Sequence, residues 1–109
     1  MKRGEIWTVA GGNDYAGKPR PAVVVQDDRF DTGDSITICL LTTDQTPGPF
    51  VRLDVAPSEA NGLRIASRLM ADKLTTLPKA RLERRIGRLD DAAMLRLNRA
   101  ITVFLGIAG

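Results

Sequence analysis

One arginine in this chain stands between two prolines, and it is the strongest candidate for chemistry. Arg20 lies in the tripeptide Pro19-Arg20-Pro21, and each proline ring stiffens the backbone beside the guanidinium. A guanidinium presents a planar fork of N–H donors that can hold two phosphate oxygens while negative charge develops on them. Such an arginine could bind a phosphate, but without further motifs a surface arginine in a proline turn is the more common explanation of this sequence.

The rest of the composition excludes several other kinds of site. Histidine is absent, which excludes zinc sites built on imidazole and nucleases that use a histidine pair as acid and base. Cys39 is the only cysteine, so neither an intrachain disulfide nor a thiolate metal cluster is possible. Because it lies in the apolar run 36–41, we expect a buried, inert thiol. No metal and no cofactor are expected.

Charge is unevenly spread along the chain. The formal net charge is only +3, but seven basic residues and three acidic ones lie between Lys79 and Arg99. A basic C-terminal third suggests a polyanion or an acidic protein as partner. A solvated helix face and strand edge would explain the same residues.

The elements that would position Arg20 are mostly short strands. The 109 residues predict a single domain, 1–109, with no linker. Alternating or β-branched runs predict strands at 5–10, 22–26, 35–42 and 50–55, with 22–26 buried on both faces. Asn61-Gly62 is the strongest turn signal. The stretch 65–77 is ambiguous, because residue propensity alone favours a helix there.

The C-terminal segment predicts an amphipathic helix capped by Asp90. Its apolar stripe is expected at Met94, Leu97, Ile101, Phe104 and Leu105. The pattern of several strands followed by one helix indicates a small sheet with the helix packed on it.

Three segments, in order, resemble the MazF/PemK toxins. Residues 2–7 (KRGEIW) are similar to the family's K-R-G-[DE]-[IV]-[WY], and residues 17–26 (GKPRPAVVVQ) to its G-x-x-R-P element. Residues 67–77 with 81–89 are similar to S-x-x-x-x-[DE]-Q-[IL]-x-[TA]-[IL] followed by I-[GT]-x-[LV]. The Arg-Pro element together with the N-terminal segment is the specific part.

The resemblance implies a mainly β fold, a small SH3-like antiparallel barrel with a C-terminal helix, assembled as a homodimer. It also implies that Ser67–Leu77 is a strand, and tertiary context often overrides propensity in this way. The implied function is the toxin of a type II toxin–antitoxin system, a metal-independent endoribonuclease that cuts single-stranded RNA. The products would be a 2′,3′-cyclic phosphate and a 5′-hydroxyl. The implied protein partner is an antitoxin with an acidic, disordered segment, and the toxin–antitoxin complex would bind DNA.

The family's catalytic positions carry over to three residues. RNA supplies the nucleophile, its 2′-hydroxyl, and the protein must stabilise the phosphorane. Arg20 would do so, and Thr42 would donate a hydrogen bond to a phosphate oxygen, with Thr43 as the alternative register. Asp72 could accept the 2′-hydroxyl proton or read a base edge. Related toxins carry an arginine two residues before that acid, where this chain has Met70, so an acid–arginine pair on one strand is not carried over.

Further residues are candidates for binding RNA. They are aromatic, polar or basic side chains beside the catalytic positions or in the basic third of the chain: Tyr15, Lys18, Ser67, Lys73 and Arg81. Trp7 could stack on a base, but a structural role in the core or the dimer interface is favoured.

Two other functions remain open. The same fold resembles CcdB, a topoisomerase (gyrase) poison without catalysis, and residues 104–107 (FLGI) are a faint echo of its tail. A non-catalytic RNA- or protein-binding barrel is the third. No apolar stretch approaches the ~20 residues that span a bilayer, and no signal-peptide core follows the first residues, so a cytoplasmic protein without a membrane contact is expected.

Overall fold

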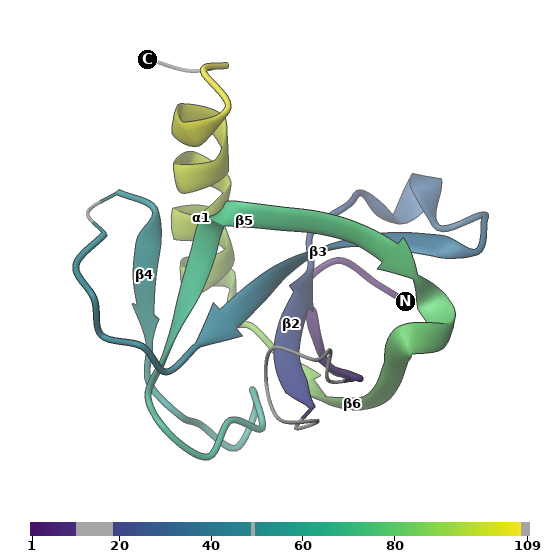
Figure 1. The fold of residues 1–109 in the computed structure, drawn as a ribbon, viewed down its shortest axis with the longest axis horizontal. Coiled ribbons are helices and arrows are strands. Elements are labelled where there is room, and N and C mark those ends of the chain that lie inside the picture. Colours follow the sequence, from purple (N-terminus) through teal and green to yellow (C-terminus); the bar gives the residue numbers. More distant parts are fainter. Residues whose placement is uncertain (11–18, 49, 108–109) are drawn as a thin grey trace.

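In the part of the chain that the structure describes, six antiparallel strands form one sheet, and a helix covers part of it (Figure 1). The computed structural model describes residues 1–10, 19–48 and 50–107. The elements in chain order are β1 (Glu5–Val9), β2 (Arg20–Val24), β3 (Ser35–Thr42), β4 (Arg52–Val55), β5 (Ser67–Pro78), β6 (Leu82–Arg88) and α1 (Asp91–Phe104), with 3-10 turns at Asp28–Phe30 and Lys79–Arg81. The sheet order is β4-β5-β3-β2-β1-β6. The expected mainly β fold class with a C-terminal helix is confirmed.

The sheet buries side chains on both of its faces. One apolar cluster lies between the sheet and α1 and includes Val23, Leu41, Leu69 and Leu97. A second cluster contains the two neighbours of Val23 in β2, Ala22 and Val24. Its other buried members are Val9, Ile36, Ile38, Leu77 and Leu82. Successive strand residues point to opposite faces, so residues 22–24 are buried on both, as predicted, but β2 spans Arg20–Val24 instead of the expected 22–26.

The ambiguous stretch is a strand, as the resemblance implied. β5 pairs with β4 through residues 67–70 and with β3 along most of its length, with a register shift between Cys39 and Leu41 of β3. Such irregularities bend a sheet and raise its local twist. Leu69 and Ala71 pack in the cluster beneath α1. Pairing on two sides outweighs the helix propensity of this segment.

The C-terminal helix begins where expected but buries a different stripe. The Asp90 carboxylate accepts a hydrogen bond from the Ala93 amide at 2.7 Å, which caps the helix. The buried residues of α1 are Ala93, Met94, Leu97 and Ala100. The prediction was wrong for Phe104 and Leu105, which are 48% and 54% exposed, because the end of α1 projects past β5 (Figure 1).

Two predicted strands are shorter than expected, and β1 ends at Val9 rather than Ala10. β4 begins at Arg52 rather than Phe50, because the chain first makes a turn in which Val51 and Arg52 both donate backbone hydrogen bonds to the Gly48 carbonyl. Phe50 has a positive φ of 72°, which a strand does not accommodate. Within the described ranges, no helix has the length and apolar character needed to cross a bilayer.

Candidate functional site

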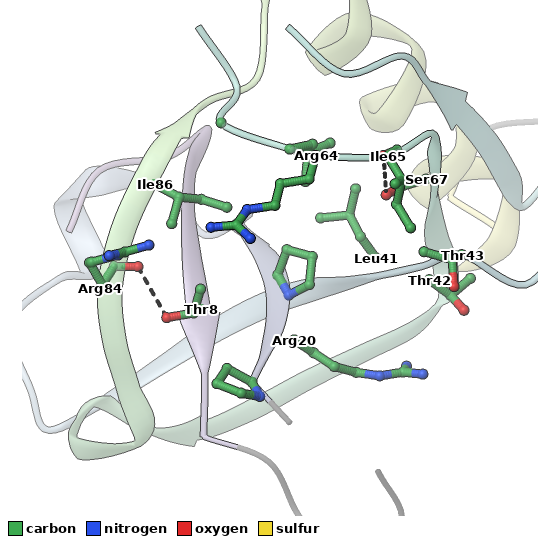
Figure 2. A pocket seen from close by; sticks show the side chains of 14 residues that line it. Thr8, Arg20, Leu41, Thr42, Thr43, Arg64, Ile65, Ser67, Arg84 and Ile86 are labelled. Atoms are coloured by element: carbon green, nitrogen blue, oxygen red, sulfur yellow. Dashed lines mark hydrogen bonds between the residues drawn. The ribbon is translucent and has the colours of Figure 1, made fainter. Parts of the chain in front are cut away.

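A cavity of about 870 Å³ opens at the ends of β2 and β3 and contains the sequence-predicted Arg20 and Thr42 (Figure 2). Its lining holds the three arginines Arg20, Arg64 and Arg84, and the four hydroxyl side chains Thr8, Thr42, Thr43 and Ser67. Among the lining residues that the structure describes there is no carboxylate. The cavity therefore suits an anionic ligand that also offers hydrogen-bond acceptors.

The pairing of β2 with β3 brings Arg20 and Thr42 together. Ala22 lies opposite Leu40 in the last residue pair of this antiparallel ladder, so Arg20 and Thr42 each lie two residues beyond that pair at the same end of it. The pairing stops before that point, and Pro21 has no N–H to donate to the ladder. The two strands separate there, and both side chains line the opening (Figure 2).

The lining hydroxyls differ in their surroundings. Thr42 is 7% exposed, and its Oγ1 accepts a hydrogen bond from the Asp44 amide at 3.1 Å. Because that oxygen accepts a hydrogen bond from the amide, the hydroxyl proton of Thr42 can donate a hydrogen bond to another acceptor. Thr43 is exposed. The buried Ser67 donates to the Ile65 carbonyl at 3.1 Å, so its hydroxyl braces the cavity wall.

One wall of the cavity is the loop between β4 and β5, which sequence reasoning did not single out. Gly62, Leu63, Arg64 and Ile65 line the cavity from this loop. The feature of the sequence that could have indicated this wall is Arg64, a basic residue two positions after the Asn61-Gly62 turn. Sequence spacing alone did not reveal that this turn lies against β6.

Asp72 does not line the cavity. Arg52 of the neighbouring β4 donates to both of its carboxylate oxygens, from Nε to Oδ1 at 2.9 Å and from Nη2 to Oδ2 at 3.1 Å. These hydrogen bonds hold the pKa of Asp72 below its ordinary value. A carboxylate with both oxygens engaged and a lowered pKa is a weak proton acceptor, so its geometry does not favour the proton-accepting role expected from the resemblance.

The other predicted RNA-binding residues are spread around the molecule. Lys73 is exposed on β5 and lies outside the cavity lining. Arg81 also lies outside it and donates to the Ala10 carbonyl at 3.1 Å. Tyr15 and Lys18 fall in residues 11–18, which are outside the described part of the chain.

Trp7 and Cys39 have structural surroundings, as expected. The indole Nε1 of Trp7 donates to Glu5 Oε1 at 3.1 Å, and the ring packs against the second apolar cluster. Cys39 is fully buried, and burial raises the pKa of its thiol to about 12. A thiol that stays protonated is not a nucleophile at neutral pH.

The chain is similar to a group of bacterial toxins. Residues 2–105 match the family model described as PemK-like, MazF-like toxin of type II toxin–antitoxin system. A probable endoribonuclease MazF of Mycolicibacterium smegmatis is 49% identical over 109 residues, covering 100% of both chains. Endoribonuclease MazF9 of Mycobacterium tuberculosis is 28% identical over 116 residues, with 98% of each covered.

Solved structures share the fold at lower identity. A mycobacterial endoribonuclease in complex with its cognate antitoxin superposes with a TM-score of 0.80 at 24% identity, covering 100% of this chain and 98% of the other. A MazE–MazF structure from Deinococcus radiodurans gives a TM-score of 0.78 at 17% identity, covering 99% and 97%. At these identities the likeness concerns the fold.

Proposed function

Because this chain belongs to the PemK-like, MazF-like toxin family of type II toxin–antitoxin systems, we propose that its cavity is where it cleaves single-stranded RNA. The chain is an endoribonuclease by its family and its relatives. The observation that carries the site proposal is the lining itself, to which the described residues contribute three arginines and four hydroxyl side chains but no carboxylate. RNA is a polyanion, and its phosphates are the groups that such a lining binds.

The reaction begins at the RNA's own 2′-hydroxyl, so the protein need not provide a nucleophile. The 2′-oxygen forms a bond to the adjacent phosphorus while the bond from phosphorus to the 5′-oxygen breaks. The 2′-hydroxyl loses its proton and the leaving 5′-oxygen gains one. A 2′,3′-cyclic phosphate and a 5′-hydroxyl result. Extra negative charge builds up on the non-bridging oxygens, and stabilising that charge is the largest contribution that the site can make.

Arg20 and Thr42 supply that stabilisation. The guanidinium fork of Arg20 binds the two non-bridging oxygens of the scissile phosphate. Thr42 donates its hydroxyl proton to one of the same oxygens, while the Asp44 amide fixes the orientation of that hydroxyl. Arg20 extends on the side of the cavity where Thr42 lies (Figure 2), and in this proposal both contact one phosphate. Pro21 lines the same opening and limits the backbone freedom beside Arg20.

Asp72 contributes to the site at most from a distance. Its ion pair with Arg52 ties β4 to β5, the strand whose first residue, Ser67, braces the cavity wall. We assign Asp72 this positioning role in place of the proton-accepting role that the resemblance implied. The exposed Lys73 and Arg81 lie outside the lining, where they steer the RNA strand electrostatically. Tyr15 and Lys18 complete the RNA-binding set by their place before Arg20 in the sequence.

Two protein partners complete the proposal. An antitoxin with an acidic segment fits the same cationic cavity, and a mycobacterial endoribonuclease of this fold was solved with its cognate antitoxin. A second copy of this chain would cover the apolar side chains that α1 exposes toward its end: Val103, Phe104 and Leu105. A gyrase poison would need no arginine-lined cavity, which favours the nuclease over that alternative.

The decisive experiment incubates the purified protein with a long single-stranded RNA in the presence of EDTA. We expect discrete fragments that carry 2′,3′-cyclic phosphates and 5′-hydroxyls. Fragments that appear only when Mg²⁺ is added would contradict the metal-independent mechanism. RNA left intact by a folded protein, together with trapping of a topoisomerase on DNA, would instead support the poison.

A further inference from the structure

Arg64 is a cation in the cavity without a partner in the described part of the chain. It follows the turn between β4 and β5, is exposed, and makes no hydrogen bond or ion pair with any residue that the structure describes. Figure 2 shows its side chain reaching across the cavity with the guanidinium turned toward Ile86. Arg20 extends instead on the side of Thr42 and Thr43 (Figure 2).

The backbone that carries Arg64 is held firmly. Asn61 is 4% exposed, and its side-chain oxygen accepts from the amides of Ser58 and Leu63 at 2.9 and 3.0 Å. Its side-chain nitrogen donates to the Ala56 carbonyl at 2.9 Å. A buried side-chain amide that satisfies three backbone groups fixes the path of the loop.

The loop is also pressed against β6. A Cβ on Gly62 would lie 2.0 Å from the Ile86 carbonyl oxygen, and one on Gly87 would lie 2.4 Å from the Asn61 carbonyl carbon. The Arg88 amide donates to the Ala60 carbonyl at 2.9 Å. Two glycines therefore allow this wall to lie in backbone contact with the sheet, so Arg64 extends from a preorganised support.

We propose that Arg64 binds an RNA phosphate next to the scissile one and so holds the strand in register with Arg20. The inference rests on the proposed function and adds a binding residue to it. The guanidinium lies in a cavity to which the described residues contribute no carboxylate, so an oxyanion is the complementary group. Because Arg20 and Arg64 reach the cavity from separate walls and point to different parts of it (Figure 2), one phosphate would not satisfy both.

The test compares Arg64→Ala, Arg64→Lys and Arg99→Ala with the wild type. Arg99 is an exposed arginine of α1 outside the cavity lining, so its removal changes the net charge equally. The probe is a short single-stranded RNA that contains the wild-type cut site, mapped beforehand, with a 2′-O-methyl group on the nucleotide whose 2′-oxygen would attack. Its dissociation constant is measured over a series of salt concentrations.

For Arg64→Ala we expect about a 10-fold weaker binding and a slope of log K against log salt that is smaller by about 0.7, the value for one lost contact to single-stranded nucleic acid. Cleavage of unmodified RNA at saturating protein should fall less than it does in Arg20→Ala, because Arg64 does not hold the scissile phosphate. Arg64→Lys should recover most of the salt slope, and Arg99→Ala should match the wild type.

The possible results distinguish a wrong assignment of Arg64 from a wrong assignment of the nuclease function. If the wild type binds and cuts while Arg64→Ala has the same dissociation constant and slope, the assignment of Arg64 is overturned and the nuclease stands. A changed cut sequence with an unchanged slope would show that Arg64 reads a base, which also overturns it. If the wild type neither binds nor cuts RNA, the proposed function fails and this inference fails with it.

Discussion

Arg52 and Asp72 form a bidentate ion pair across β4 and β5, with separations of 2.9 and 3.1 Å. Arg52 lies opposite Met70 in this strand pair, so its guanidinium reaches the acid of β5 from the neighbouring strand. Both side chains are largely shielded, with exposed fractions of 16% and 25%. The pair is therefore less screened than an ordinary surface pair.

The pH dependence of this pair is the first prediction. Because Arg52 lowers the pKa of Asp72 in the folded protein, the pair stabilises the fold above the ordinary aspartate pKa of about 3.9. That stabilisation is lost as the pH falls through the lower folded value. Asp72→Asn should reduce the free energy of unfolding at pH 7 by about 1–2 kcal/mol. The difference from wild type should shrink below roughly pH 4, as measured by urea denaturation.

Asp54→Asn is the matched control, because Asp54 also pairs with an arginine, Arg68, but is 79% exposed. Asp54→Asn should reduce the free energy of unfolding by less than about 1 kcal/mol. RNA cleavage by Asp72→Asn, measured per folded molecule, should fall only modestly, because Asp72 affects the cavity only through the placement of β5. Complete loss of cutting in that folded variant would restore a chemical role for Asp72.

The second prediction concerns Arg20. Arg20→Ala should lower the single-turnover cleavage rate by about 10²–10³-fold or more, because the charge that builds up on the phosphorane loses its main counter-charge. Arg20→Lys keeps a cation but not the fork and should recover only part of the rate. Circular dichroism should show the same fold for all three proteins. If Arg20→Ala cleaves RNA at the wild-type rate, the active site does not include Arg20.

The third prediction separates Thr42 from Thr43. The Thr42 hydroxyl is oriented by the Asp44 amide, so Thr42→Ala should lower the cleavage rate by about 10-fold or more, with a smaller loss in RNA binding. Thr42→Ser keeps the hydroxyl and should restore most of the rate. Thr43→Ala should have the smaller effect, because that side chain is exposed. The reverse order would place the catalytic hydroxyl at Thr43.

Local sequence signals were sufficient for the elements that local interactions determine. The β-branched run at Ser35–Thr42 forms a strand with the expected bounds, and Asp90 caps α1 because its short carboxylate reaches a free helix amide. The strand at Ser67–Pro78 needed the family resemblance, since its pairing partners lie far away in the chain. The exposure of Phe104 was missed because a helical pattern does not reveal where the sheet ends.

The cavity was only partly predictable for the same reason. Arg20 and Thr42 follow from the motif, and their meeting follows from one strand register. Arg64 enters through a loop whose path depends on backbone contact with β6. The partner of Asp72 comes from β4, and no sequence pattern specifies which arginine will lie across a strand from a given acid.

The fourth prediction tests that loop contact. In Gly87→Ala the new Cβ would lie 2.5 Å from the Ala60 carbonyl oxygen, so either the loop or β6 must move. We expect a loss of about 1–3 kcal/mol in stability and weaker RNA binding, because the wall that carries Arg64 shifts. Gly33→Ala is the control, since a Cβ there meets nothing within 4 Å. Equal melting temperatures for both variants would refute the tight contact.

The fifth prediction concerns the helix that covers the sheet. Leu97 is fully buried in the cluster between α1 and the sheet, whereas Leu95, two residues earlier, is 55% exposed. Leu97→Asp removes apolar packing and buries a charge without a partner, so it should reduce the free energy of unfolding by at least about 4 kcal/mol. That is most of the stability of a marginal domain of this size. Leu95→Asp makes the same chemical change at a solvent-facing position and should leave the isolated chain folded. Thermal unfolding followed by circular dichroism compares the two, and equal curves would mean that α1 packs through a different face.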